Sequence, residues 1–293
     1  MNTPQPGILE PIPTCARYLE FELKSGANPT DALLRLSAPE MTTPCVVGFG
    51  VTVMNTLNCR IAALRPFPDL TNAQCSVPST QADIWCAVSA GEPGDAVHRS
   101  RAIEAVLSPE FNCTQRVDGF KFKEGRDLTG YVDGTENPEG DDAIKAALMN
   151  DTNAGLNGSS LVAVQKWVHN LDRFENFDAL HRDHIIGRRL SDNAELDDAP
   201  ASAHVKRTAQ ESFDPEAFVV RRSLPWSDAS GSGLMFVAYG KSLDAFEAQM
   251  KRMIGNEDGI VDGLFEFSQP ITGGYYWCPP VTDGKLNLSA LGL

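Results

Sequence analysis

Two segments that lie far apart in this chain share one pattern: an apolar stretch of strand length, a short polar break, and an amphipathic helix. The first is ADIWCAVSAGEPGDAVHRSRAIEAVL, residues 82–107, and the second is GLMFVAYGKSLDAFEAQMKRMI, residues 233–254. In the second, Phe246 and Met250 recur at helical spacing after Ser242, the expected N-cap. A strand needs a partner strand, and an amphipathic helix needs a face to cover. The pattern therefore predicts a sheet with helices packed on it in each half of the chain.

Other segments extend this pattern in both directions. In the N-terminal half we predict strands at 16–24, 45–54, 82–89 and 115–123, and helices at 28–37 and 95–107. In the C-terminal half we predict strands at 160–169, 217–222 and 234–239, and helices at 176–186 and 242–254. The fold class that follows is α+β, with two ferredoxin-like (βαββαβ) units joined through antiparallel sheets. We place one unit in residues 1–150 and the other in residues 151–293, with an exposed tail, Pro279–Leu293, that lacks a core pattern.

The charge balance limits the partners of this protein. The net charge is −14 and the sequence pI is about 4.8, so nucleic acid and anionic lipid repel the chain. No apolar run approaches the roughly 18 residues that a membrane-spanning helix needs. The N-terminus has neither a signal-peptide pattern nor a twin-arginine pair. We therefore expect a cytoplasmic protein that binds neither nucleic acid nor membrane. The seven cysteines include no CxxC pair, so we expect them to be reduced and mostly buried.

The segment TGYVDGTENP, Thr129–Pro138, is the first candidate for chemistry. Two glycines flank Asp133, and Gly134 permits a positive φ or a close backbone approach just after it. Such a segment can direct a carboxylate into a confined space. The alternative is an ordinary turn in which Asp133 caps the backbone, and the segment alone favours this alternative.

A histidine and an arginine in the second half are further candidates. His204 follows a long acidic loop and precedes Lys206 and Arg207, so an imidazole could meet a cofactor there while basic neighbours reach its anionic groups. Arg221 alternates with apolar residues of a strand, and an inward-facing arginine needs an anionic partner. Surface positions for these side chains remain open alternatives.

Taken in order, GYVDGTENP, HIIGR, SAHVKRT, VVRRSLPW and FEFSQPITGGYYW resemble the bacterial dye-decolorizing peroxidases of the B-type (P-class) branch. The resemblance extends from about residue 7 to residue 279. It implies a heme-dependent peroxidase that reduces hydrogen peroxide and oxidises phenolic or dye-like donors through ferryl intermediates. It also implies one heme b (iron protoporphyrin IX) per chain, between the sheet and the helices of the C-terminal half.

The resemblance assigns roles to individual residues. Asp133 matches the distal aspartate, Arg221 the distal arginine beside the peroxide site, and His204 the proximal iron ligand, which is the one metal ligand that we expect from the protein. Asp262 is aligned with the carboxylate that accepts from the proximal imidazole.

Four more residues are expected near the cofactor. Arg188, in HIIGR, matches an arginine that contacts a heme propionate, and Glu136 lies near the heme edge. We add Arg207 as a neighbour of anionic groups. Ser223 stands where many relatives carry asparagine, and this departure puts the distal water network in doubt.

Alternatives remain open at this stage. A heme-handling protein that releases iron would share the same contacts, and a heme-free ferredoxin-like interaction protein would share only the fold. We expect a homodimer or a larger homo-oligomer. The tail DGKLNLSALGL loosely resembles peptides that load relatives into encapsulin shells, although an ordinary docked C-terminus is the stronger expectation.

Overall fold

The computed structural model describes residues 2–42, 44–153 and 155–293. Its N-terminal half contains the following elements: η1 (Pro6–Ile8), β1 (Cys15–Leu23), α1 (Thr30–Leu36), α2 (Pro39–Thr42), β2 (Cys45–Phe49), α3 (Val51–Thr56), β3 (Ile84–Ala90), α4 (Pro93–Leu107), β4 (Phe111–Phe120) and α5 (Gly140–Ala147). Within the described residues, no helix is long and apolar enough to cross a membrane.

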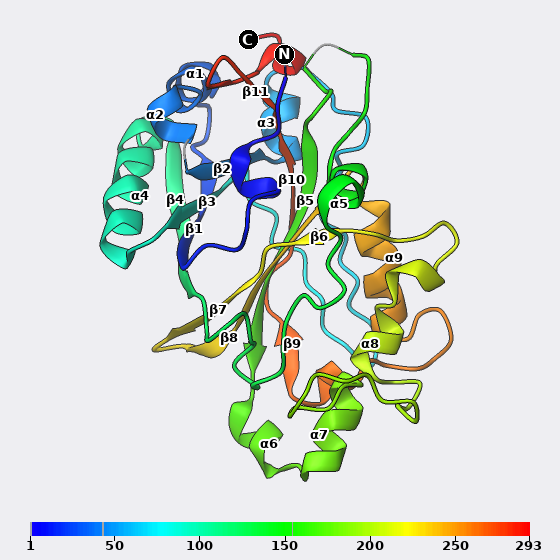
Figure 1. Cartoon of the computed structure of the whole chain (residues 1–293). Coiled ribbons are helices and arrows are strands. Elements are labelled where there is room, and N and C mark those ends of the chain that lie inside the picture. Colours follow the sequence, from blue (N-terminus) through cyan, green and yellow to red (C-terminus); the bar gives the residue numbers. More distant parts are fainter. Residues whose placement is uncertain (1, 43, 154) are drawn as a thin grey trace.

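The C-terminal half starts with the long strand β5, which runs through the middle of the molecule toward α6 in Figure 1. Its elements are β5 (Ser160–His169), α6 (Leu171–Asn176), α7 (Ala179–Ile186), α8 (His204–Arg207), η2 (Gln210–Ser212), β6 (Val220–Arg221), β7 (Leu224–Asp228), β8 (Gly231–Gly240), α9 (Asp244–Met253), η3 (Gly263–Glu266), β9 (Ser268–Pro270), β10 (Gly274–Cys278), β11 (Val281–Thr282), β12 (Lys285–Leu286) and η4 (Ser289–Leu291).

The two halves arrange their strands in the same order. In the first half the order is β4-β1-β3-β2, and every pair is antiparallel. In the second half β10, β5, β8 and β7 follow one another, again with antiparallel pairs. When the short strands β6 and β9 are left out and the four strands named for each half are numbered along the chain, both halves have the order 4-1-3-2. The repeated strand–helix pattern of the sequence thus corresponds to a repeated strand order.

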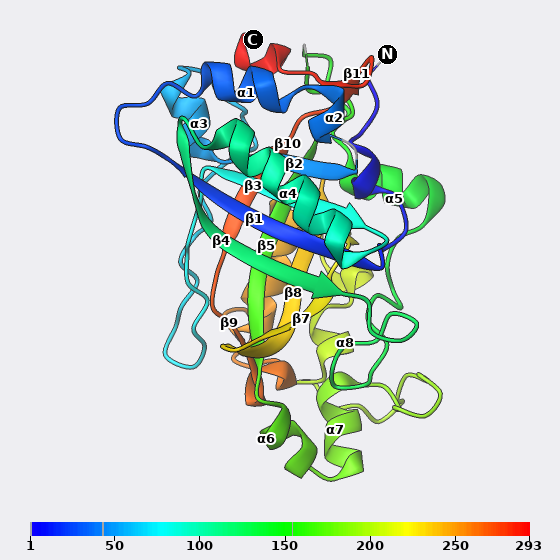
Figure 2. The ribbon, with the colours of Figure 1, turned by 90° about the vertical axis from the view of Figure 1, so that its left-hand side faces the viewer.

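The halves join into one barrel-like sheet. Strand β4 pairs with β7, β2 pairs with β10, and the pairing of β5 with β8 closes the ring. The barrel interior holds large aromatic side chains, and Trp85 stacks between Tyr18 and Tyr276 with ring centroids 6.2 and 6.1 Å away. Helix α4 lies across β1 and β3 on the outside (Figure 2). A second core on the outer face extends from α1 and α4 to α9.

Several predicted bounds differ from the structure; for example, only Val220–Arg221 of the strand expected at 217–222 forms β6. Two of the differences occur at a glycine or an aspartate. The strand expected at 45–54 ends at Phe49, and α3 begins directly after Gly50. The Gly50 N–H donates to the Asp83 carbonyl, and a Cβ at Gly50 would lie 2.5 Å from the Ala82 carbonyl oxygen. Glycine permits this close approach of the two backbones. The chain turns at Gly50 and enters α3, although the β-branched residues that follow favour a strand. The helix expected at 176–186 begins at Ala179, because Asp178 caps α7 by accepting from the His181 N–H.

The exposed tail was a wrong prediction. Leu286, Leu288 and Leu291 are each only 4% exposed and belong to the outer core. The strand β10 was also missed, although its residues are fully buried between β2 and β5. The expectation for the cysteines is confirmed, since all seven are free and five are buried.

Candidate functional site

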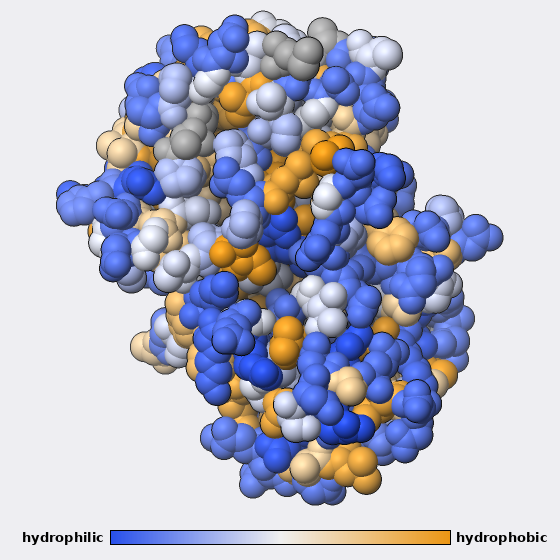
Figure 3. Space-filling view, viewed as in Figure 1, coloured by the Kyte–Doolittle hydropathy of each residue, from blue (hydrophilic) through white to orange (hydrophobic). Residues whose placement is uncertain are grey.

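A cavity lies between the outer face of the sheet and the helices of the second half. Its apolar wall comes from strand β8 and helix α9 and includes Leu234, Phe236, Phe246 and Met250. The loop from Val132 to Glu136 forms a polar wall. Figure 3 shows that the surface facing the viewer is mostly hydrophilic, with scattered hydrophobic groups. Because Leu234, Phe236, Phe246 and Met250 line one side of the cavity, this apolar wall suits a flat organic molecule better than a hydrated ion.

Asp133 lines this cavity at the centre of the polar loop. Gly134 has φ +79°, a backbone conformation that favours glycine, and the Asp133 N–H donates to the Gly125 carbonyl at 3.0 Å. Burial raises the pKa of the Asp133 carboxyl, while the positive charge of Arg221 opposes this shift and the negative charge of Asp127 adds to it. The carboxyl of Asp133 is thus tuned to exchange a proton at a higher pH than an exposed aspartate.

Arg221 lines the same cavity, and Asn137 holds its strand against the Asp133 loop. The Asn137 Oδ1 accepts from the Arg221 N–H at 2.8 Å, and the Asn137 Nδ2 donates to the Arg221 carbonyl at 3.1 Å. Gln210 makes a second link, because its Nε2 donates to the Glu136 carbonyl and its Oε1 accepts from the Val219 N–H. In the described part of the chain the buried Arg221 Nε has no hydrogen-bond partner. A partly buried arginine with an unused, buried N–H donor is suited to an anionic or polar ligand.

His204 is the first residue of α8, and it lies next to a buried carboxylate. Its Nδ1 is 2.8 Å from Oδ2 of Asp262, a side chain that is 0% exposed. The other oxygen of Asp262 accepts from the Leu264 N–H at 2.8 Å, so η3 fixes the carboxylate. The pair leaves the His204 Nε2 directed away from Asp262, and His204 lines the cavity. An imidazole held by a carboxylate in this way is the usual arrangement of a histidine metal ligand.

Gly187 and Arg188 connect helix α7 to this cavity. Gly187 ends α7 with φ +91°, and a Cβ there would lie 2.3 Å from Cγ2 of Val205 in α8. The Arg188 guanidinium is 2.7 Å from Glu136 and 3.0 Å from Glu195. All three of these charged side chains line the cavity. The structure therefore brings together six predicted residues: Asp133, Glu136, Arg188, His204 and Arg221 in the lining, with Asp262 behind His204.

Two predicted cofactor contacts are not part of this lining. Arg207 is 4% exposed and donates to both oxygens of Asp258 at 2.7 and 2.8 Å, which directs its guanidinium away from the cavity. Ser223 is also buried, and its Oγ accepts from the Val237 N–H at 3.3 Å. Because both side chains have partners in the protein, we leave them out of the proposed cofactor contacts.

The sequence reasoning missed several residues of the site. Asn137 and Gln210 hold the loop and the strand together, and His169 also lines the cavity. The sequence contained one signal for His169: it ends the predicted strand 160–169 on the same face as Gln165 and Trp167, which also line the cavity.

Two family models match the chain over most of its length. Residues 22–121 match the N-terminal model of the Dyp-type peroxidases, and residues 124–283 match the C-terminal model. The chain therefore belongs to the Dyp-type peroxidases, a family of heme-dependent peroxidases, and is an oxidoreductase. This membership confirms the resemblance on which the sequence-based function rests.

Individual relatives agree with this assignment. The dye-decolorizing peroxidase of Mycobacterium tuberculosis is 30% identical over 95% of this chain and 89% of its own length. A dye-decolorizing protein from V. cholerae superposes with a TM-score of 0.86 at 27% identity, over 98% of this chain and 99% of that one. A variant of DypB from Rhodococcus jostii, solved in complex with heme, has a TM-score of 0.85 at 26% identity, over 93% of this chain and 94% of its own.

Proposed function

We propose that this chain binds one heme b in the cavity, with His204 as the iron ligand, and uses it to reduce hydrogen peroxide at the expense of phenolic or dye-like donors. The observation that carries the proposal is the placement of a carboxylate-bound histidine in the same cavity as an acid and a guanidinium, namely Asp133 and Arg221. When bound, heme supplies the redox-active iron at which peroxide is reduced.

The residues of the cavity suit a porphyrin. The apolar wall offers Phe236, Phe246 and Met250 to a flat hydrophobic ring. Arg188 offers a guanidinium for a propionate, although Glu136 and Glu195 now share it. The unpartnered Nε of Arg221 supplies a buried donor.

The chain's own groups divide the acid–base work. Asp133 takes a proton from one oxygen of hydrogen peroxide and returns it to the other, as a positioned carboxyl near its own pKa can do. Arg221 stabilises the negative charge that develops on the departing oxygen. Asp262 accepts from the His204 Nδ1–H and makes the opposite nitrogen a stronger electron donor to a metal.

The ligand assignment has a spectroscopic test. We expect the purified protein to show a Soret band that is lost or shifted in His204→Ala and unchanged in His181→Ala. His181 is a matched control because it also pairs with a carboxylate, that of Glu266, but does not line the cavity. An unchanged spectrum in His204→Ala would refute the ligand assignment.

The catalytic assignment is tested with heme-loaded protein. Asp133→Asn and Arg221→Leu should each retain the Soret band and lower kcat/KM for hydrogen peroxide by about 100-fold or more, in line with the loss of an acid–base or electrostatic group. If heme-loaded wild-type protein shows no turnover with peroxide and a phenolic donor, the chain handles heme without peroxidase catalysis.

We further propose that the halves are two ferredoxin-like units, divided near residue 150, and that the chain belongs to the B-type branch and forms a homodimer or a larger homo-oligomer. The shared 4-1-3-2 strand order supports the two units. Encapsulin loading by the tail remains a prediction, and the burial of Leu286, Leu288 and Leu291 favours the ordinary docked C-terminus. Co-purification with a shell protein, with and without residues 281–293, tests it.

A further inference from the structure

Three side chains outside the predicted site form a continuous hydrogen-bonded chain. His169 Nδ1 lies 2.6 Å from the Ser268 Oγ, and its Nε2 lies 3.1 Å from Oδ1 of Asp127. The residues come from three separate parts of the sequence: the end of β5, the start of β9 and the loop before Thr129. The strands place His169 and Ser268 directly opposite each other in the antiparallel register.

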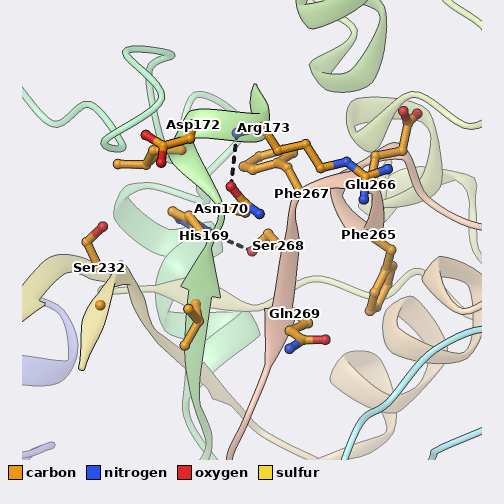
Figure 4. Close-up of a pocket in the computed structure, with 13 residues that line it drawn as sticks. His169, Asn170, Asp172, Arg173, Ser232, Phe265, Glu266, Phe267, Ser268 and Gln269 are labelled. Atoms are coloured by element: carbon orange, nitrogen blue, oxygen red, sulfur yellow. Dashed lines mark hydrogen bonds between the residues drawn. The ribbon is translucent and has the colours of Figure 1, made fainter. Parts of the chain in front are cut away.

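Two members of this group belong to the linings of two cavities. His169 and Ser268 line the candidate heme cavity, and they also line a second cleft of about 670 Å³. Figure 4 shows the cleft, with the hydrogen bond between His169 and Ser268 at its floor. The charged residues Asp172, Arg173 and Glu266 surround it. A proton that reaches Ser268 from the cleft is therefore already at the wall of the heme cavity.

The surroundings keep Asp127 ionised and determine which nitrogen of His169 carries a hydrogen. Burial alone would raise the pKa of Asp127, but hydrogen bonds from His169 and Thr129 bring it below its usual range. Asp127 is therefore ionised at neutral pH and can only accept, so the His169 Nε2 carries a hydrogen and Nδ1 accepts from the Ser268 hydroxyl. The side chain of His169 is only 7% exposed, and that of Asp127 16%. An imidazolium formed at this position is stabilised by a nearby carboxylate that is largely shielded from water.

The same three residue types also form nucleophilic triads, but the burial of Ser268 argues against that role. Ser268 is 3% exposed and lies inside the β5–β9 ladder, so a bulky electrophile has no approach to its Oγ. The position of Asp127 instead relates the group to the heme cavity, because the negative charge of Asp127 raises the pKa of Asp133. The charge of Asp127 thus acts on the carboxyl that exchanges protons in the heme cavity.

We propose that Ser268, His169 and Asp127 form a proton-loading station that moves protons from the outer cleft to the cavity used by Asp133. This inference rests on the proposed peroxidase function, and it gives that function a proton supply. Reduction of hydrogen peroxide to two waters consumes two electrons and two protons. A donor without an ionisable hydroxyl supplies only the electrons, so the protons must come from solvent.

Each transfer returns the group to its starting state. A hydronium ion in the cleft gives a proton to the Ser268 Oγ while the original hydroxyl proton moves to His169 Nδ1, which leaves water and an imidazolium. The imidazolium then returns its Nδ1 proton to Ser268, whose hydroxyl has rotated toward the heme cavity and releases its other proton to an acceptor there. One proton has crossed, Asp127 has stayed ionised, and no electron has moved.

Ser268→Ala tests the station, because it removes the hydroxyl and leaves the volume almost unchanged. With ABTS, a donor without a hydroxyl proton, we expect kcat at pH 7 to fall by about tenfold, which is less than the roughly 100-fold or greater effect of a direct general acid or base because Ser268 acts only as a relay. The solvent deuterium isotope effect on kcat should increase, because proton delivery becomes rate-limiting. Ser268→Thr retains a hydroxyl and should restore both values. Gln269→Ala, which alters the same cleft without touching His169, should resemble wild type.

A measurement that does not depend on activity examines the charge states. In the ferrous carbon monoxide form, which is diamagnetic, the ¹⁵N signals of His169 should show a neutral imidazole protonated at Nε2, and Asp127→Asn should alter this pattern. A neutral imidazole protonated at Nδ1 would overturn the proposal.

Three further outcomes would also overturn it: a wild-type rate and isotope effect in Ser268→Ala, a loss of rate in Ser268→Thr equal to that of Ser268→Ala, or covalent labelling of Ser268 by a fluorophosphonate. The proposed function fails separately, through the absence of a Soret band or of peroxide turnover in the wild-type protein.

Discussion

At the scale of single residues, the site combines groups whose charge is costly in the folded protein. Asp133 is partly buried, and its raised pKa means that the carboxylate is less stable in the folded chain than in the unfolded chain. Arg221 opposes this shift without cancelling it. A carboxyl that exchanges protons with a substrate must exist in both the neutral and the ionised form in the folded protein. The ionised form lowers the free energy of unfolding, which is a common effect of functional groups.

Asp133→Asn should therefore stabilise the heme-free protein at pH 7. The folded pKa is raised, so the unfolded chain ionises first as the pH rises, and the cost of the buried charge is fully present above the folded pKa. Below the unfolded pKa, near 3.8, the carboxyl is neutral in both states and the advantage of Asn should vanish. Thermal unfolding at pH 7 and near pH 3.5 checks the sign, and a lower Tm for Asp133→Asn at pH 7 would contradict it.

Arg207 should affect stability more than heme binding. Arg207→Met removes a buried guanidinium that binds both oxygens of Asp258 and the Arg252 carbonyl. We expect the free energy of unfolding to fall by about 1–3 kcal/mol, below the value for a fully buried pair because Asp258 is partly exposed. Heme affinity should be nearly unchanged in titrations, whereas Arg188→Met should weaken it. A large loss of heme affinity in Arg207→Met would instead support the prediction that Arg207 contacts the heme.

At this scale, an ordered set of motifs pointed to residues that the structure places in one cavity. Asp133, His204 and Arg221 could be named because the motifs follow one another in a recognisable order. His169 and Asp127 could not be paired, because they are 42 positions apart and only the fold brings them to 3.1 Å. The pairing of Arg207 with Asp258 could not be predicted, because the pattern SAHVKRT does not show that Asp258 lies within reach.

At the scale of elements, the close packing of α7 on α8 positions the proposed iron ligand. Gly187 ends α7 in the left-handed conformation, and the absence of a Cβ lets Val205 approach. Val205 immediately follows His204 in α8. A change in the spacing of these two helices therefore moves the imidazole relative to Asp262.

Gly187→Ala should lower the free energy of unfolding much more than Gly259→Ala. Both glycines have positive φ, so both substitutions carry a left-handed cost of about 1 kcal/mol. Only the Cβ at residue 187 also meets a neighbour, Val205 Cγ2 at 2.3 Å, which should add about 1–3 kcal/mol of overpacking strain. Chemical denaturation measures the difference.

The heme spectrum tests whether that strain reaches His204. We expect Gly187→Ala to weaken heme binding, and the additional substitution Val205→Ala to restore part of it by relieving the contact. Equal losses of stability in Gly187→Ala and Gly259→Ala would show that the contact with Val205 has no energetic weight.

Elements with strong periodicity were predictable, and those shaped by tertiary contacts were not. Strand β5 has the predicted bounds, and α4 and α9 lie where their apolar stripes indicated. The segment after Gly50 has strand propensity but forms α3, because the close contact of Gly50 with the Ala82 carbonyl turns the chain. Strand β10 begins at Gly274, directly after Gly273, and has prolines on both sides, so its sequence did not indicate a strand.

At the scale of the whole molecule, the sheet closes through contacts that no local pattern encodes. The halves meet at the β4–β7 and β2–β10 pairs, each of which has a single registered residue pair. The α+β class followed from the sequence, but the closed arrangement depends on β10, which was missed. Closure places Trp85, Tyr276 and Glu20 in an interior that excludes water.

Glu20 should make the stability of the whole barrel depend on pH. Burial raises its pKa from 4.5 to about 7, although the Tyr276 hydroxyl donates to its carboxylate at 3.2 Å. Between these two values the folded chain keeps a proton that the unfolded chain has lost, so the free energy of unfolding falls as the pH rises and the full cost is present above about 7. A difference of this size corresponds to about 3 kcal/mol.

Glu20→Gln keeps an acceptor for Tyr276 and removes the charge. The variant should equal wild type in stability near pH 4 and exceed it by up to about 3 kcal/mol at pH 8, as measured by chemical denaturation at a series of pH values. Glu22→Gln is the matched control, because Glu22 lies on the same strand with an exposed side chain and should give no such divergence. If the curves of Glu20→Gln and wild type stay parallel from pH 4 to 8, Glu20 is not a buried titrating group and the barrel interior admits water.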